Sequence, residues 1–184
     1  MRRVAVFSAA LLIVLGAFGA SAFTSGYVDR TASVDVVADD VGLVGLTDGN
    51  AGSLVDTSGD KLSIDFSSAG GSGANADGYF ELGDPNNGNE TYAFNITNND
   101  NSAHTLSLNY TLDTEDSDSG ANVTFEVYDS TDSQLLSATD ENGEQSSSTD
   151  AVASGETVHA VVIVDTTGKT SSDDLSGTLR VKMN

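Results

Sequence analysis

The sequence predicts an all-β protein: a β-sandwich of jelly-roll or immunoglobulin-like topology that follows an N-terminal signal segment. Three observations predict this fold. Beyond the first thirty residues, apolar and polar side chains alternate with a period of two in several short segments. Clusters of Gly, Ser, Asn and Asp separate those segments, as turns separate strands. None of the segments repeats its apolar residues every 3.6 positions, so we expect no amphipathic helix there.

Residues 1–22 are typical of a secretory signal peptide. Arg2 and Arg3 precede an uncharged apolar run, and Ala-Ser-Ala ends it. Those small residues suit signal peptidase, so we expect cleavage between Ala22 and Phe23, with Sec and twin-arginine export both open. An uncleaved membrane anchor is the alternative, because about 20 apolar residues can span a bilayer. After cleavage we expect a secreted protein, extracellular or on the cell surface, with no stable membrane insertion.

Residues 23–184 are expected to form a single domain, since their number suits one core. Its first strand is predicted within residues 23–37, where two faces alternate. The apolar face carries Val28, Ala32, Val34 and Val36. The polar face carries Asp29, Thr31, Ser33 and Asp35.

Further strands are predicted along the rest of the chain by the same alternation. They fall within residues 62–66, 92–96, 106–112, 123–127 and 175–183. The run 158–164 is apolar on both faces, which predicts a central strand. We expect the polar stretch 130–150 to be rich in loops. The Gly- and Asn-rich stretch 70–89 is expected to be a long loop or an embellishment.

The composition excludes several classes of function. The chain has 28 acidic and 7 basic residues, for a formal net charge of -21. Nucleic acid is excluded as a partner, because its binding depends on Lys and Arg that neutralise phosphates. Abundant Asp with few Lys is typical of halophilic proteins, whose acidic surfaces stay soluble in salt. The absence of Cys excludes disulfides and thiol chemistry.

No catalytic motif is present in the sequence: there is no nucleophile elbow, no H-E-x-x-H and no P-loop. We interpret His104 as a surface histidine and His159 as a packed one, rather than as a pair of metal ligands. The sequence therefore predicts a protein that is not an enzyme, with no catalytic residues, no cofactor and no metal site. Two oxygen-rich loops, 73–84 and 113–118, leave calcium binding open as an alternative.

Four N-x-Thr sequons are candidate N-glycosylation sites, with the acceptors Asn89, Asn95, Asn109 and Asn122. The last three alternate with apolar neighbours in the predicted strands. We therefore expect their side chains on polar faces, where a glycan would leave the core undisturbed. Unmodified Asn in Thr-rich strands is the alternative.

Several short motifs are spread along the chain. Ala22-Phe23-Thr24-Ser25 leads directly into the alternating segment that ends at Val37. Tyr-Ala-Phe-Asn-Ile-Thr-Asn at 92–98 is followed by Leu-Ser-Leu at 106–108. Gly-Glu-Thr-Val at 155–158 then enters the Val-rich run. Together these motifs resemble the TasA/camelysin-like secreted proteins, above all their haloarchaeal relatives of unknown function. The resemblance covers most of the chain after the signal segment, although its motifs are short.

The resemblance implies a jelly-roll-like sandwich that assembles into extracellular fibres, in which the N-terminal strand of one subunit completes a sheet of the next. It makes 23–37 a candidate donor strand, whose apolar face would enter an acceptor groove. An ordinary first strand within its own domain is the alternative. Some members carry a metalloprotease label, which the lack of H-E-x-x-H gives no reason to transfer.

The sequence therefore predicts a secreted, non-enzymatic structural protein of the cell surface or extracellular matrix. Its expected partners are copies of itself in a filament, or other surface proteins. The alternative is a monomeric extracellular binding module for calcium or carbohydrate. The absence of Trp, a frequent platform for sugars, disfavours the carbohydrate version.

Overall fold

The computed structural model describes residues 38–57, 60–68, 73–114, 121–140 and 146–184. In these ranges the chain is all-β, as predicted, with antiparallel strands and one short 3-10 turn, η1 (Asp39–Val41). The predicted signal peptide and the candidate donor strand 23–37 lie outside the described residues.

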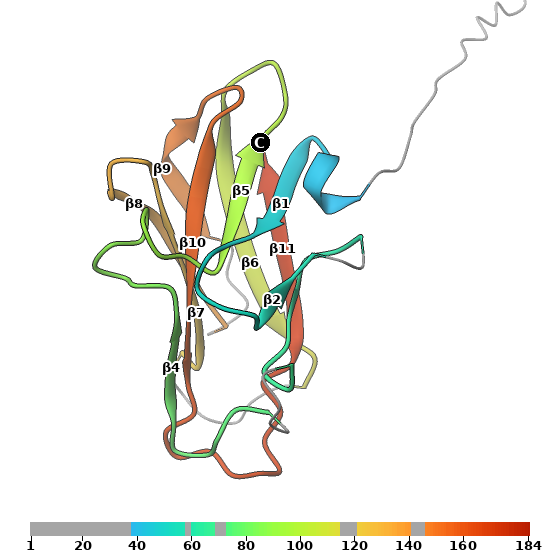
Figure 1. Cartoon of the computed structure of the whole chain (residues 1–184), viewed down its shortest axis with the longest axis vertical. Coiled ribbons are helices and arrows are strands. Elements are labelled where there is room, and N and C mark those ends of the chain that lie inside the picture. The colour runs from blue at the N-terminus through green and yellow to red at the C-terminus, as the bar shows by residue number, and fades with distance from the viewer. Residues whose placement is uncertain (1–37, 58–59, 69–72, 115–120, 141–145) are drawn as a thin grey trace, which may run out of the picture. The chain divides into compact units, whose positions relative to one another are not determined.

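The larger sheet has six strands, which Figure 1 shows on the near side. Five run in the order β1 (Val44–Asp48), β5 (Phe94–Asn98), β10 (Thr157–Asp165), β7 (Val123–Tyr128) and β8 (Gln134–Thr139). The sixth, β4 (Tyr79–Leu82), pairs with the second half of β10. Because β10 contacts β5, β7 and β4, the prediction of a central strand at 158–164 is confirmed.

The smaller sheet has three strands in the order β11 (Gly177–Met183), β6 (His104–Leu112) and β9 (Ser146–Val152). A separate two-stranded sheet joins β2 (Val55–Asp56) to β3 (Ser63–Ile64). The two larger sheets share one hydrophobic core. Phe94 and Phe125 enter it from the six-stranded sheet, and Leu108 enters it from the three-stranded sheet. The period-two alternation seen in the sequence is therefore a burial pattern.

The prediction that residues 130–150 are rich in loops is wrong, because this stretch holds β8 and the start of β9. β8 buries Leu135, Leu136 and Ala138, and a register shift opposite β7 lets two consecutive leucines turn inward. β9 buries Val152 in the core and adds polar contacts to β6: the Leu106 amide donates to Ser148 Oγ at 3.0 Å. Such a strand depends on its neighbour more than on its own apolar pattern.

The stretch 70–89 also contains structure, since β4 lies within it. The segment that leads into β4 is held in place by Thr166, which is 5% exposed. The Thr166 hydroxyl donates to the Asn75 carbonyl at 2.6 Å and accepts from the Gly78 amide at 2.8 Å. These bonds tie the segment before β4 to the segment after β10.

Candidate functional site

A cleft of about 940 Å³ lies between the two larger sheets. We call it the inter-sheet cleft. The six-stranded sheet contributes Leu46, Val123, Phe125, Val162 and Val164. The three-stranded sheet contributes Tyr110, Leu179 and Val181, and the β3 region contributes Leu62, Ile64 and Phe66. Several of these side chains are only half buried, so the cleft leaves apolar surface that further burial would stabilise.

Two edge strands supply residues to the inter-sheet cleft. β1 is the outermost strand of its sheet and β11 is the outermost strand of the smaller sheet. Among the described residues, each pairs with a strand on one side only. The other side of such a strand offers unpaired N–H and C=O groups, which can bind a further strand.

Charged side chains line part of the cleft. Its wall carries Asp39, Asp65, Asp173 and Asp174 together with Lys61 and Lys169. Hydrogen bonds from Ser67 lower the pKa of Asp65, and bonds from Ser176 lower the pKa of Asp174. Both carboxyl groups are therefore ionised at neutral pH.

Tyr110 anchors one end of the cleft. Its hydroxyl donates to the Leu175 carbonyl at 2.8 Å. Burial, with the nearby Asp140 carboxylate, raises the pKa of Tyr110 to about 12, so the hydroxyl remains a donor at neutral pH. The segment that leads into β11 is thereby held against β6.

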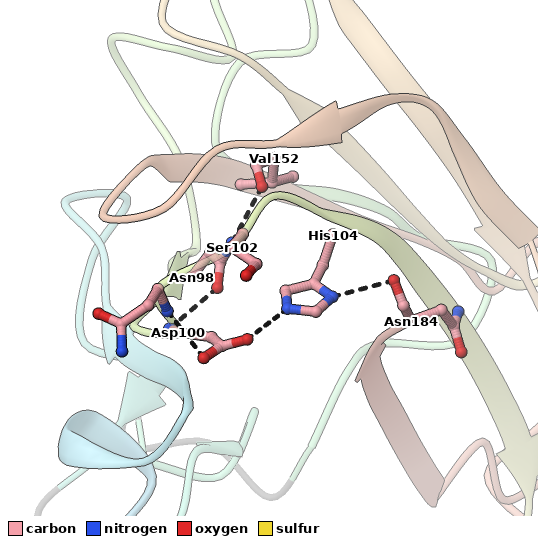
Figure 2. Close-up of polar contacts among 7 residues, drawn as sticks. Asn98, Asp100, Ser102, His104, Val152 and Asn184 are labelled. Carbon is pink, nitrogen blue, oxygen red and sulfur yellow. Dashed lines mark hydrogen bonds and ion pairs between the residues drawn. The ribbon is translucent and has the colours of Figure 1, made fainter.

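The second polar cluster is centred on His104 and shown in Figure 2. His104 Nε2 lies 2.5 Å from Asp100 Oδ2, and Nδ1 lies 3.0 Å from the main-chain oxygen of Asn184. The Asp100 hydrogen bond raises the pKa of His104, and the same contact lowers the pKa of Asp100. A protonated ring, donating from both nitrogens, fits these two acceptors.

Asn98 builds the turn that carries this cluster (Figure 2). Its side chain is fully buried and its amide donates to the Ser102 carbonyl at 2.8 Å and the Val152 carbonyl at 2.9 Å. Its Oδ1 accepts from the Asp100 amide at 3.1 Å. The cluster closes the β5–β6 connection and offers no nucleophile–base pair, because both nitrogens of His104 are engaged by other groups.

His159 lies on the other sheet, so the two histidines do not meet. Its Nδ1 is 2.9 Å from Asn95 Oδ1, and its ring stacks on Tyr92 with centroids 4.3 Å apart. Burial lowers the pKa of His159, which keeps the ring neutral. The contacts of both histidines agree with the structural interpretation: one lies at the surface and one is packed.

The four sequon asparagines have different environments. Asn89, Asn95 and Asn109 are partly exposed. Asn122 is only 9% exposed, so the expectation that it projects from an open polar face is wrong. It precedes β7 beside Asp140, whose carboxylate accepts from the main-chain N–H of Asn122 at 2.8 Å. Glycosylation at these positions stays a prediction.

The first oxygen-rich loop does not form a calcium loop. β4 lies between Asp77 and Asp84 and carries them to opposite ends of a strand. Asp77 Oδ1 accepts from the Gly168 amide, and Asp84 accepts from the Asn86 amide and the Asn87 side chain. Most of the second loop, 115–118, lies outside the described residues. In the described part of the chain, no three His, Asp or Glu side chains are grouped so that they could hold a metal ion.

Within the same ranges, no helix has the length and apolar character needed to cross a bilayer. Sequence reasoning missed the inter-sheet cleft, because residues from distant segments meet there only in the fold. The candidate donor strand stays a prediction. Comparisons with protein-family models, curated proteins and solved structures gave no match to this chain.

Proposed function

We propose that this chain is a secreted, non-enzymatic structural protein that assembles into extracellular filaments, with residues 23–37 of one copy donated to the next. The inter-sheet cleft carries the proposal. It combines half-buried apolar side chains with two edge strands, β1 and β11, and both features suit an added strand.

The fold is proposed to be a jelly-roll sandwich. Three antiparallel pairs are nested in the chain: β7 with β8, β6 with β9, and β5 with β10. Rolling up such a nested double strand produces the two facing sheets of a jelly roll. β1 and β11 then extend this arrangement at the outer side of β5 and β6.

The physical basis for assembly is burial of the apolar face of residues 23–37. Val28, Val34 and Val36 would each contribute about 1.5–3 kcal/mol if the cleft removed them fully from water. Main-chain hydrogen bonds to an edge strand would add affinity, and alternate side chains would add specificity. Because donor and acceptor are different surfaces of one chain, the contact is head-to-tail and can propagate.

The acidic composition and the sequons support an extracellular surface role. The full chain has a formal net charge of -21, and none of its acidic residues lies in the predicted signal peptide, so the subunit is strongly acidic, which favours solubility and disfavours nucleic acid as a partner. We propose copies of the same chain as the main partner. The separation of Asp77 from Asp84 disfavours the calcium-binding alternative at that loop.

Electron microscopy and sedimentation of the signal-cleaved protein in molar salt test the proposal. We expect regular filaments, and their loss without loss of folded subunit when residues 23–37 are deleted. Val34→Asp should abolish filaments because it places a charge on the apolar face, whereas the matched control Ser33→Asp should not.

A monomer at all accessible concentrations would overturn self-assembly and favour the binding module. Unfolding of the domain on deletion of 23–37 would instead identify this segment as an ordinary first strand.

A further inference from the structure

We infer that β11 is the edge that receives the donated strand, in parallel orientation, and that charges on both faces of that strand select it. The inference rests on the proposed strand donation and adds the acceptor edge, the direction and the residues that set the register.

β11 is an edge strand with a partner on one side only, among the described residues. It pairs with β6 over seven consecutive positions, from Gly177 opposite Leu112 to Met183 opposite Leu106. Its alternation divides it into two faces. Leu179, Val181 and Met183 pack against the core while remaining half buried. Thr178, Arg180 and Lys182 are exposed on the other face.

The outer face of β11 carries unusual charge for this protein. Two of the seven basic residues, Arg180 and Lys182, stand on it two positions apart. Opposite them on β6 lie Asn109 and Ser107, which are uncharged. Throughout the described residues the salt bridge formed is His104–Asp100, so neither cation of β11 is paired with a carboxylate. The polar face of residues 23–37 has a complementary charge at Asp35.

β1, the rival edge, has the opposite character. Residues 38–48 contain Asp39, Asp40 and Asp48 and no basic residue. Asp39 and Asp40 lie in η1 and Asp48 ends β1, so a donated strand would find no cation on β1 and its carboxylates would meet a like charge at Asp48. Electrostatics therefore favours β11 over β1.

The direction of the donated strand follows from Arg30, the only basic residue in 23–37. Arg30 is at an even position, so it lies on the same face of the predicted strand as the apolar residues. An arginine that enters an apolar cleft needs a carboxylate partner. Asp173 and Asp174 line the cleft immediately before β11. If Arg30 lies at the N-terminal end of β11, near Asp173 and Asp174, then Ala32, Val34 and Val36 can lie along β11 only when the two strands run parallel. The register then places Arg30 beside Gly177, Ala32 beside Leu179, Val34 beside Val181, Asp35 beside Lys182, and Val36 beside Met183.

Crosslinking tests the edge directly, because the sequence has no Cys and single-cysteine variants report only engineered contacts. Thr31→Cys and Thr178→Cys lie beside each other in the proposed register. Thr47→Cys on β1 is the matched control. Two single-cysteine variants, each comprising residues 23–184, are mixed, assembled and oxidised. We expect disulfide-linked heterodimers of the 31 and 178 variants, identified by peptide mapping, and few of the 31 and 47 variants.

Charge reversal tests the selection. Arg180→Glu with Lys182→Glu should raise the concentration needed for filament formation roughly tenfold, and adding Asp35→Lys should restore much of the loss. Filaments that crosslink through position 47, or that ignore the charge reversal, would overturn the β11 assignment while leaving strand donation intact. The absence of filaments and of any crosslink would overturn both.

Discussion

Asn95 of β5 and His159 of β10 lie opposite each other in an antiparallel pair and share a hydrogen bond of 2.9 Å between Oδ1 and Nδ1. Because the Asn oxygen only accepts, His159 must carry its proton on Nδ1. The Asn95 amide donates in turn to Thr47 Oγ1 of β1, at 3.2 Å. One side chain thereby connects β1, β5 and β10 on the outer face of the larger sheet.

Replacing Asn95 should weaken this connection. We expect Asn95→Ala to lower the free energy of unfolding by about 1–3 kcal/mol, because two partners lose their hydrogen bonds. Chemical denaturation measures the change. Asn101→Ala is the control: Asn101 is exposed, and the change should stay within about 0.5 kcal/mol. Equal effects of the two substitutions would contradict the connecting role.

Asn98 should tolerate substitution poorly. Asn98→Asp removes the amide that donates to Ser102 and Val152, and it points a carboxylate at their carbonyl oxygens in a fully buried place. We expect a loss of about 3–5 kcal/mol at neutral pH, as for other unpaired buried charges.

The same burial raises the pKa of the introduced carboxyl group. The charge-dependent part of the penalty should therefore be absent below the unfolded pKa of about 3.9 and should grow as the pH rises towards the raised folded pKa, while the loss of the amide donor persists at every pH. Denaturation of Asn98→Asp at several pH values checks this trend, with Asn101→Asp as the exposed control. A penalty independent of pH would show that the charge is not its cause.

The Asp100–His104 contact should be visible by NMR titration. We expect the pKa of His104 above its ordinary 6.5, and a decrease on Asp100→Asn, because the carboxylate favours the protonated ring. The contribution of His104 to stability is complete below 6.5 and disappears as the pH rises through its folded pKa. The contribution of Asp100, whose pKa is lowered, is present above 3.8 and disappears on acidification.

The difference in stability between the wild type and Asp100→Asn should therefore be largest between these two values. The contact is exposed, so we expect a small effect. An unchanged His104 titration in the variant would contradict the assignment.

Gly83 and Gly155 offer a matched pair of substitutions. Both adopt positive φ, at 107° and 73°. A Cβ at Gly83 would lie 2.8 Å from the Thr91 oxygen and 2.9 Å from Val161 Cγ2, whereas a Cβ at Gly155 meets open space. Both Ala variants pay for backbone strain, and only Gly83→Ala adds a clash. We expect a clearly larger drop in melting temperature for Gly83→Ala, and equal drops would contradict the clash.

Among the sequons, Asn122 should be the one without a glycan. It is 9% exposed and begins a core strand, so a transferase acting on the folded protein could not reach its amide. Peptide mapping of the secreted protein by mass spectrometry should find Asn122 unmodified, whatever the state of the other three. A glycan at Asn122 would show that modification precedes folding.

Strands with alternating apolar residues could be predicted from the sequence to within about two residues. β6, β7 and β11 are examples, because their burial follows the local alternation. β9 could not be found this way: Ser146–Val152 becomes a strand through its pairing with β6. β3 is shorter than expected, since Phe66 lies beyond its end.

The candidate site also has a part that the sequence pattern indicates and a part that only the fold reveals. A donor segment is a continuous stretch, so its alternation is readable in one place. The inter-sheet cleft joins Leu46, Phe125 and Leu179, which are far apart in the chain, and only the fold brings them together. The cationic face of β11 was readable as two alternate residues, but its edge position depends on the strand order.

The nested pairing of the strands has a consequence for the order of folding. β7 and β8 are joined by a short turn, whereas β5 pairs with β10 across a much longer stretch of chain, which contains β6 to β9. Loop-closure entropy favours the inner pair first and the outer pairs later. β1 and β11 attach to β5 and β6, so the walls of the inter-sheet cleft are expected to form last. If residues 23–37 are donated as proposed, a subunit built this way could receive a partner only after its core is complete, which would disfavour association before folding is finished.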